Sequence, residues 1–149
     1  MNCTAIQKCR ELRENKEIEL IVVDYLQVVS DMLEKENITL AQQKQIIGKL
    51  KCLAEELNCA ILVLSQLTRS AEKRTRHFPC VADFPVHAAI GKYADAILLL
   101  YREFYYYMRE DENHATLYIA RSKNKSGIGT SLWFDPDIPK FHDYFENES

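Results

Sequence analysis

The sequence predicts an α/β fold in which a parallel central sheet is followed by antiparallel hairpin strands. In the first part of the chain, short apolar runs alternate with helical patterns, and this order builds parallel sheets with right-handed crossovers. In the last part, strand patterns follow one another with only turns between them, which is typical of hairpins. A length of 149 residues suits one domain, so we expect residues 1–149 to form a single unit.

The first predicted helix spans residues 4–15, where apolar side chains recur at helical spacing. A strand follows at residues 18–23, because this run is apolar and rich in β-branched residues, as in a strand covered on both faces. A long helix then begins at Thr39, a good N-cap residue, and keeps its apolar residues at helical spacing as far as Leu57. Asn58 is a suitable terminator for that helix.

A second buried strand is expected at residues 60–64, and a charged, mobile loop at residues 69–79 separates it from a short helix. This helix runs from Pro85, which fits the first turn of a helix, to Tyr93. The remaining predicted strands lie at residues 96–101, 115–121, 130–134 and 140–145.

Composition narrows the class of protein. Hydrophobic residues make up 47% and charged residues 28% of the chain, which is ordinary for a globular protein. A net charge of −3 argues against nucleic-acid binding through bulk charge, but not against a local basic loop. Five cysteines without a C-x-x-C pair indicate neither a zinc site nor a disulfide framework, and reduced thiols fit a cytoplasmic protein. No run is long and apolar enough to span a membrane.

Polar residues follow three of the predicted strands: Asp24 with Gln27, Ser65 with Gln66, and Arg102 with Glu103. Ligands of open α/β sheets gather outside the carboxyl ends of the strands, so these ends can share one site. Asp24 is placed to hold a metal ion bound to nucleotide phosphates, and Gln66 can orient water or bind a phosphate. The alternative is structural: Asp24 caps a turn, and Gln66 satisfies backbone groups of a loop.

Four segments in order resemble the DnaB-like replicative helicases. The string LIVVDYLQ at residues 20–27 is similar to their Walker B segment, which ends in DYLQ after four apolar residues. The other three are LAEELN leading into ILVLSQLTR at residues 53–69, ADAILLLYRE at residues 94–103, and IARSKN running on to GT at residues 119–130. One such string would say little, but four collinear strings at similar spacing over most of residues 18–145 are specific.

The resemblance implies a partial RecA-like P-loop NTPase core, working in a homo-hexameric ring that hydrolyses ATP with Mg²⁺. It also implies movement along single-stranded DNA with duplex unwinding in replication, and primase and a helicase loader as partners. Asp24 matches the Walker B aspartate that supports Mg²⁺, and Gln66 matches the glutamine that senses the γ-phosphate. Arg121 and Lys123 match a basic pair, one member of which acts as an arginine finger on ATP of the neighbouring subunit. The finger position falls on Lys123, with Lys125 as a competitor because the turn is one residue longer.

The chain also departs from the family pattern. The phosphate-binding loop G-x-x-x-x-G-K-S/T does not occur, and in the family this loop and the catalytic glutamate precede the matched segments. We therefore expect residues 1–149 to be a partial RecA-like domain, a fragment or a degenerate descendant, that alone hydrolyses no ATP and holds no tightly bound cofactor. At the finger position, a lysine lacks the planar fork that grips phosphate oxygens in two places.

The DNA-facing loop of the family is altered as well. Its sequence DLRESG aligns with residues 83–88, where only the aspartate is kept and the arginine becomes Pro85. A loop that should offer an arginine to DNA phosphates has turned apolar, which weakens DNA contact there. Asp83 and Arg69 remain as the candidate DNA contacts.

Two other functions stay open. A non-catalytic interaction module would keep the subunit-contacting hairpin and dock on an intact helicase. A fragment of a RecA/RadA-type recombinase or of a circadian-clock-type ATPase would share the core, and its K-N-R hairpin resembles Lys123-Asn124-Lys125. The DYLQ string is more typical of the replicative helicases.

Several conspicuous residues have plainer interpretations. The four histidines share no metal-ligand spacing. The tyrosine-rich run at residues 101–107 is better explained as a packed strand end than as a base-stacking surface, because few cations are interleaved. The basic residues Arg69, Lys73, Arg74 and Arg76 fit an exposed loop at least as well as a phosphate contact. By contrast, Arg121, Lys123 and Lys125 stand beside a tight turn, which favours a phosphate or nucleotide role.

Overall fold

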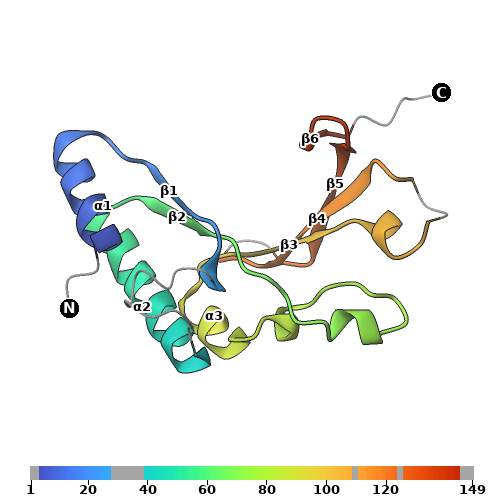
Figure 1. The fold of residues 1–149 in the computed structure, drawn as a ribbon, viewed down its shortest axis with the longest axis horizontal. Coiled ribbons are helices and arrows are strands. Elements are labelled where there is room, and N and C mark those ends of the chain that lie inside the picture. The colour runs from blue at the N-terminus through green and yellow to red at the C-terminus, as the bar shows by residue number, and fades with distance from the viewer. Residues whose placement is uncertain (1–3, 28–38, 109–110, 124–125, 145–149) are drawn as a thin grey trace. The chain divides into compact units, whose positions relative to one another are not determined.

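The computed structural model describes residues 4–27, 39–108, 111–123 and 126–144 (Figure 1). The chain forms two compact units. The first comprises residues Met1–Thr68 and Phe84–Ala94, and the second comprises Arg69–Asp83 and Asp95–Ser149. Each unit is described by itself below. In the described residues, none of the helices has the length and apolar character needed to cross a membrane.

The first unit contains three helices and two strands: α1 (Thr4–Asn15), β1 (Leu20–Val23), α2 (Leu40–Leu57), β2 (Ala60–Val63) and α3 (His87–Tyr93). Thr39 caps α2 as predicted, and it forms a capping box with Gln42. Asn58 ends the helix in the left-handed conformation, with φ 47° and ψ 50°, and its N–H bonds the carbonyls of Ala54 and Glu55. The predicted boundaries of this helix are therefore confirmed.

Strands β1 and β2 pair in parallel, with Leu20 opposite Ala60 and Val23 opposite Val63. Figure 1 shows α2 running beside this pair. The core of the unit lies between the strands and the helices, and it consists of Val23, Leu26, Ile46, Leu50, Val86 and Ala89. Large apolar side chains on the strands and just beyond them are partly exposed: Leu20, Val22, Leu62 and Leu64, each between 44 and 55%. The pair is thus buried on one face, whereas parallel sheets are usually covered on both.

Helix α3 begins at His87, two residues later than the sequence predicts. Val86 occupies the N-cap position with φ −121° and ψ 37°, outside the helical region. Its side chain is only 2% exposed and packs in the core, so the chain enters the helix from this anchored residue.

The second unit is a four-stranded antiparallel sheet in the order β3-β4-β5-β6. The strands are β3 (Ile97–Tyr101), β4 (His114–Arg121), β5 (Ile128–Asp135) and β6 (Lys140–Asp143). The hairpins predicted for the last part of the chain are therefore confirmed. Short 3-10 turns occur at Ala71–Lys73, Val81–Asp83 and Glu103–Tyr105.

One topological prediction is wrong. The helix–strand alternation predicts a third parallel strand at residues 96–101, but β3 pairs antiparallel with β4, with Leu98 opposite Ile119 and Tyr101 opposite Thr116. The strand exists where it was expected. Its hydrogen-bonding partner is its successor in the sequence, because the connection after β3 folds the chain back as a hairpin. Arg102 and Glu103 consequently follow a strand of the antiparallel sheet, and they are not part of the site formed at the ends of β1 and β2.

Candidate functional site

The carboxyl ends of β1 and β2 form one edge, because the two strands are parallel and in register. Backbone pairing continues past the strands: the Leu64 N–H donates to the Val23 carbonyl at 2.9 Å, and the Leu26 N–H donates to the Leu64 carbonyl at 2.8 Å. Asp24 follows Val23 directly, and Gln66 lies two residues after Leu64. The structure therefore brings the segments that carry the predicted metal-binding carboxylate and phosphate-sensing amide to the same edge.

Both of these side chains are open to solvent. Asp24 and Gln66 are exposed, and neither side chain makes a hydrogen bond or ion pair with another described residue. Leu26 lies between them in the chain fold and is only 1% exposed, so the segment after β1 is anchored in the core. The arrangement is a fixed backbone that presents two free polar groups, which is what a ligand site requires.

Gln27 makes a further connection across this edge. Its Nε2 donates to the Ser65 hydroxyl at 3.1 Å and to the Gln66 carbonyl at 3.2 Å, while its Oε1 accepts from the Gln66 N–H at 3.2 Å. The sequence singles out Gln27 only as one polar residue after the first strand. The role of its amide depends on a contact 39 residues away in the chain, which the sequence pattern alone does not reveal.

The donor set at this edge fits Mg²⁺ only as a shared ligand. Mg²⁺ takes six oxygen ligands and usually binds one or two carboxylates, with nucleotide phosphates and water completing the shell. Among the described residues, no cluster of three or more His, Cys, Asp or Glu side chains could hold a metal ion by itself. Asp24 can therefore supply one carboxylate to an ion that is held mainly by a nucleotide.

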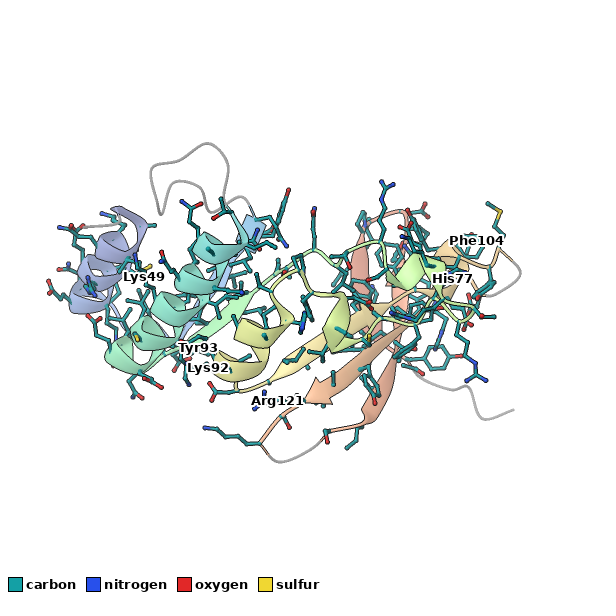
Figure 2. The ribbon with its side chains drawn as sticks, turned by 90° about the horizontal axis from the view of Figure 1, so that it is seen from below. Lys49, His77, Lys92, Tyr93, Phe104 and Arg121 are labelled. Atoms are coloured by element: carbon teal, nitrogen blue, oxygen red, sulfur yellow. The ribbon has the colours of Figure 1, made fainter. Side chains whose placement is uncertain are left out.

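The basic residues of the predicted nucleotide site lie on the hairpin between β4 and β5. Arg121 ends β4, opposite Ile97 of β3, and is exposed (Figure 2). Lys123 is 80% exposed and forms an ion pair with Asp95 at 3.3 Å. Such exposed pairs contribute little free energy, so the lysine can exchange this partner for another anion. Lys125, the competitor for the finger position, lies outside the described residues.

Of the two candidate DNA contacts, Asp83 has a structural role instead. It is 1% exposed, and its carboxylate accepts from the Ser70 hydroxyl, the Arg74 guanidinium and the Cys80 N–H, each at 2.8 Å. The bonds to Arg74 hold the pKa of Asp83 well below its ordinary range, against the effect of burial, and Cys80 and Ser70 add to that lowering. No oxygen of Asp83 is left for DNA, so we remove it from the candidate interface. Arg69 is exposed and stays a prediction.

The same network corrects the prediction of a charged, mobile loop at residues 69–79. Arg74 spans this loop, because its guanidinium also donates to the Phe78 carbonyl at 2.7 Å. Its bonds to Asp83 join the start of the segment to its end. Arg74 is therefore a structural residue, whereas the other basic residues of the loop are exposed.

The tyrosine-rich run is largely packed, as the sequence favours. Tyr101 is 8% exposed, and its ring contacts Phe78 edge-on at 5.1 Å between centroids. His77 stacks on Tyr106 at 4.8 Å, and the Tyr107 hydroxyl bonds the Thr75 carbonyl. These rings hold the loop at residues 75–78 in place. Tyr105, at 79% exposure, is the member of the run that stays open.

The fold belongs to a known class. The chain matches a solved structure of a helicase-type ATPase domain with a TM-score of 0.82 and 28% identity, over 95% of this chain and 50% of that one. It matches a DnaB-like replicative helicase, solved for its interactions with primase, with a TM-score of 0.82 and 29% identity, over 95% of this chain and 35% of that one. These similarities define a RecA-like ATPase fold.

The family follows from sequence. The family model of the DnaB-like helicase C terminal domain matches residues 1–143, and the chain belongs to that family. A probable replicative DNA helicase of Trieres chinensis is 37% identical over 138 residues, and the replicative DNA helicase DnaB of Geobacillus stearothermophilus is 34% identical over 136. These matches cover 89 and 90% of this chain but 30% of each relative. The chain thus spans about 30% of the length of these curated relatives.

Proposed function

We propose that this chain supplies the Walker B and γ-phosphate-sensing part of an ATP-driven replicative DNA helicase. The observation that carries the proposal is the shared edge of β1 and β2, where Asp24 and Gln66 lie on segments joined by main-chain hydrogen bonds. The family match gives that edge its context, because the relatives named above are replicative helicases.

The roles of the residues follow from their chemistry. Asp24 would hold Mg²⁺ through one carboxylate, and the ion would neutralise the charge of the nucleotide phosphates. Gln66 carries an amide that can donate to a γ-phosphate oxygen and accept from water. Lys123, with Arg121 beside it on the hairpin, would place a positive charge on the nucleotide of a neighbouring subunit, and Lys125 is the alternative. A charge supplied in trans works only in an oligomer, which agrees with a hexameric ring.

The proposal also covers partners and location. Single-stranded DNA is the track along which such a motor would move in the cytoplasm, with Arg69 as a candidate phosphate contact. Primase and a helicase loader are proposed as protein partners. The structural relative solved for its interactions with primase supports the first of these.

The experiment is a chimaera in which this chain replaces the matching segment of the Geobacillus helicase. We expect the chain alone to show no ATP turnover above background, because its sequence contains no phosphate-binding loop. The chimaera, which regains that loop, should hydrolyse ATP with Mg²⁺. Asp24→Asn should lower its kcat by about 100-fold, whereas Asp137→Asn, at an exposed turn, should leave kcat unchanged. A folded, hexameric chimaera without ATPase activity would refute the proposal.

A second candidate is a non-catalytic module that docks on an intact helicase. The partly exposed apolar side chains of β1 and β2 favour it to the extent that they need a covering segment. Its distinguishing result is a stable complex between this chain and an intact helicase ring without nucleotide. Membership of the DnaB-like family replaces the recombinase alternative.

A further inference from the structure

The main chain of Gln66 lacks a strand partner at the point where the ligand edge begins. The last backbone bond between the two segments runs from the Leu26 N–H to the Leu64 carbonyl. Beyond it, both main-chain groups of Gln66 are bonded by one side chain, the amide of Gln27. The side chain of Gln27 therefore continues the parallel ladder by two further hydrogen bonds.

The orientation of this amide is fixed by its partners. A backbone N–H must meet an acceptor and a backbone carbonyl must meet a donor, so Oε1 faces the Gln66 N–H and Nε2 faces the Gln66 carbonyl. A flipped amide would set donor against donor and acceptor against acceptor. The third bond, from Nε2 to the Ser65 hydroxyl, is made in the same orientation.

We propose that Gln27 is a positioning residue that fixes the main chain of Gln66 and so directs the Gln66 side chain towards the γ-phosphate. This inference rests on the proposed function, in which Gln66 touches the nucleotide. Gln27 starts from a rigid point, because the preceding Leu26 is 1% exposed in the core. The Gln66 side chain is exposed and free, so the fixed main chain is what limits its direction.

The geometry requires glutamine. Asparagine has the same amide on a side chain one methylene shorter, and glutamate has the reach but no donor for the Gln66 carbonyl. Methionine has a similar length and offers neither group. Because Gln27 lies three residues after Asp24, one amide connects the metal-binding segment to the phosphate-sensing segment. A change at one segment is thereby transmitted to the other.

The contact is tested first in the full chain. Hydrogen exchange of the Gln66 amide, followed by NMR, should accelerate about tenfold or more in Gln27→Met, because the acceptor is gone. Gln27→Glu keeps the acceptor and should accelerate it less. Gln45→Met makes the same chemical change at an exposed position of α2 and should leave the Gln66 amide unchanged. Circular dichroism checks that each variant folds, and unchanged exchange in folded Gln27→Met would overturn the inference.

The role in the reaction is tested in the chimaera by a double-mutant cycle. Gln27→Met should lower kcat about tenfold with KM unchanged, and Gln66→Ala about 100-fold. In the Gln66→Ala background, Gln27→Met should cause no further loss, since it acts only through Gln66. Equal losses in both backgrounds would assign Gln27 a merely structural role and overturn the inference alone. An inactive parent chimaera would instead overturn the proposed function, and the role of Gln27 with it.

Discussion

The two compact units hold their irregular segments by different means. In the first unit, residues 24–27 are tied to residues 64–66 by main-chain bonds and the neutral amide of Gln27, over an aliphatic core. In the second unit, residues 70–83 are tied by the carboxylate of Asp83 and the guanidinium of Arg74. The first unit depends on packing and neutral hydrogen bonds, and the second depends on a buried charge.

This difference has a consequence for function. A neutral amide carries no net charge into the ligand edge, so Asp24 keeps the only formal charge that residues 24–27 and 64–66 offer a cation. A buried carboxylate, by contrast, is stable only while its partners remain bonded to it. The loop that follows the first unit is thus held firmly without any group of Asp83 being available to a ligand. The comparison predicts that charge changes will act on the second unit and packing changes on the first.

The largest expected effect is that of Asp83→Ala, which removes every partner of the anchored loop at once. The Ser70 hydroxyl, the Arg74 guanidinium and the Cys80 N–H all lose their acceptor. We expect the free energy of unfolding to fall by about 3 kcal/mol, measured by urea denaturation with circular dichroism. Glu72→Ala, at an exposed carboxylate of the same loop, should change it by less than about 0.5 kcal/mol. Equal effects of the two variants would break the comparison.

A smaller effect is expected from acid. The pKa of Asp83 lies below the ordinary value of 3.8, chiefly because of its bonds to Arg74, so the folded state binds fewer protons than the unfolded chain. This stabilisation is complete above pH 3.8 and is lost as the pH falls through the lower, folded pKa.

The measurement is the free energy of unfolding of the wild type and Asp83→Asn at pH values from about 6 down to about 3. The wild type should lose more stability over this range than the variant, whose amide does not titrate. Parallel pH profiles would show that other carboxylates, and not Asp83, cause the acid sensitivity. The Gln27 contact contains no titratable group, so the Gln66 amide should keep its protection until the chain unfolds.

The sequence predicts the local elements well because their signals are local. The Thr39 cap, the Asn58 terminator and the apolar period between them delimit α2 without reference to the rest of the chain. The pairing of β3 is a different matter. An apolar run such as residues 97–101 suits a parallel or an antiparallel neighbour equally, so the partner depends on how the following connection folds back.

The candidate site divides in the same way. Asp24 and Gln66 are found from the sequence because each follows a recognisable strand and matches a family string. The burial of Asp83 and the bonds of Gln27 are not found, because both depend on partners that the sequence does not order in space. For Asp83 the partner is 9 residues away, and for Gln27 it is 39. A motif match thus identified a residue type at position 83 but assigned it the wrong task.

The smallest expected effect tests the packing side of the comparison. Gly48 lies inside α2, and a Cβ added there would meet the Tyr93 ring of α3 at 3.6 Å, an ordinary contact (Figure 2). Gly48→Ala should therefore raise the free energy of unfolding by about 0.5–1 kcal/mol, since alanine favours the helix and gains that contact.

The matched control is Gly127→Ala in the hairpin of the second unit, where φ is +76° and a side chain is strained. It should lower the free energy of unfolding by about 1 kcal/mol, although the nearest atom is 3.7 Å away and space is available. Both values come from the same urea titration. If Gly48→Ala also destabilised the protein, the α2–α3 contact would be too tight to admit a methyl group, and the first unit would be limited by overpacking. The opposite signs expected for the two glycines therefore separate a position that can gain packing from one that depends on its backbone conformation.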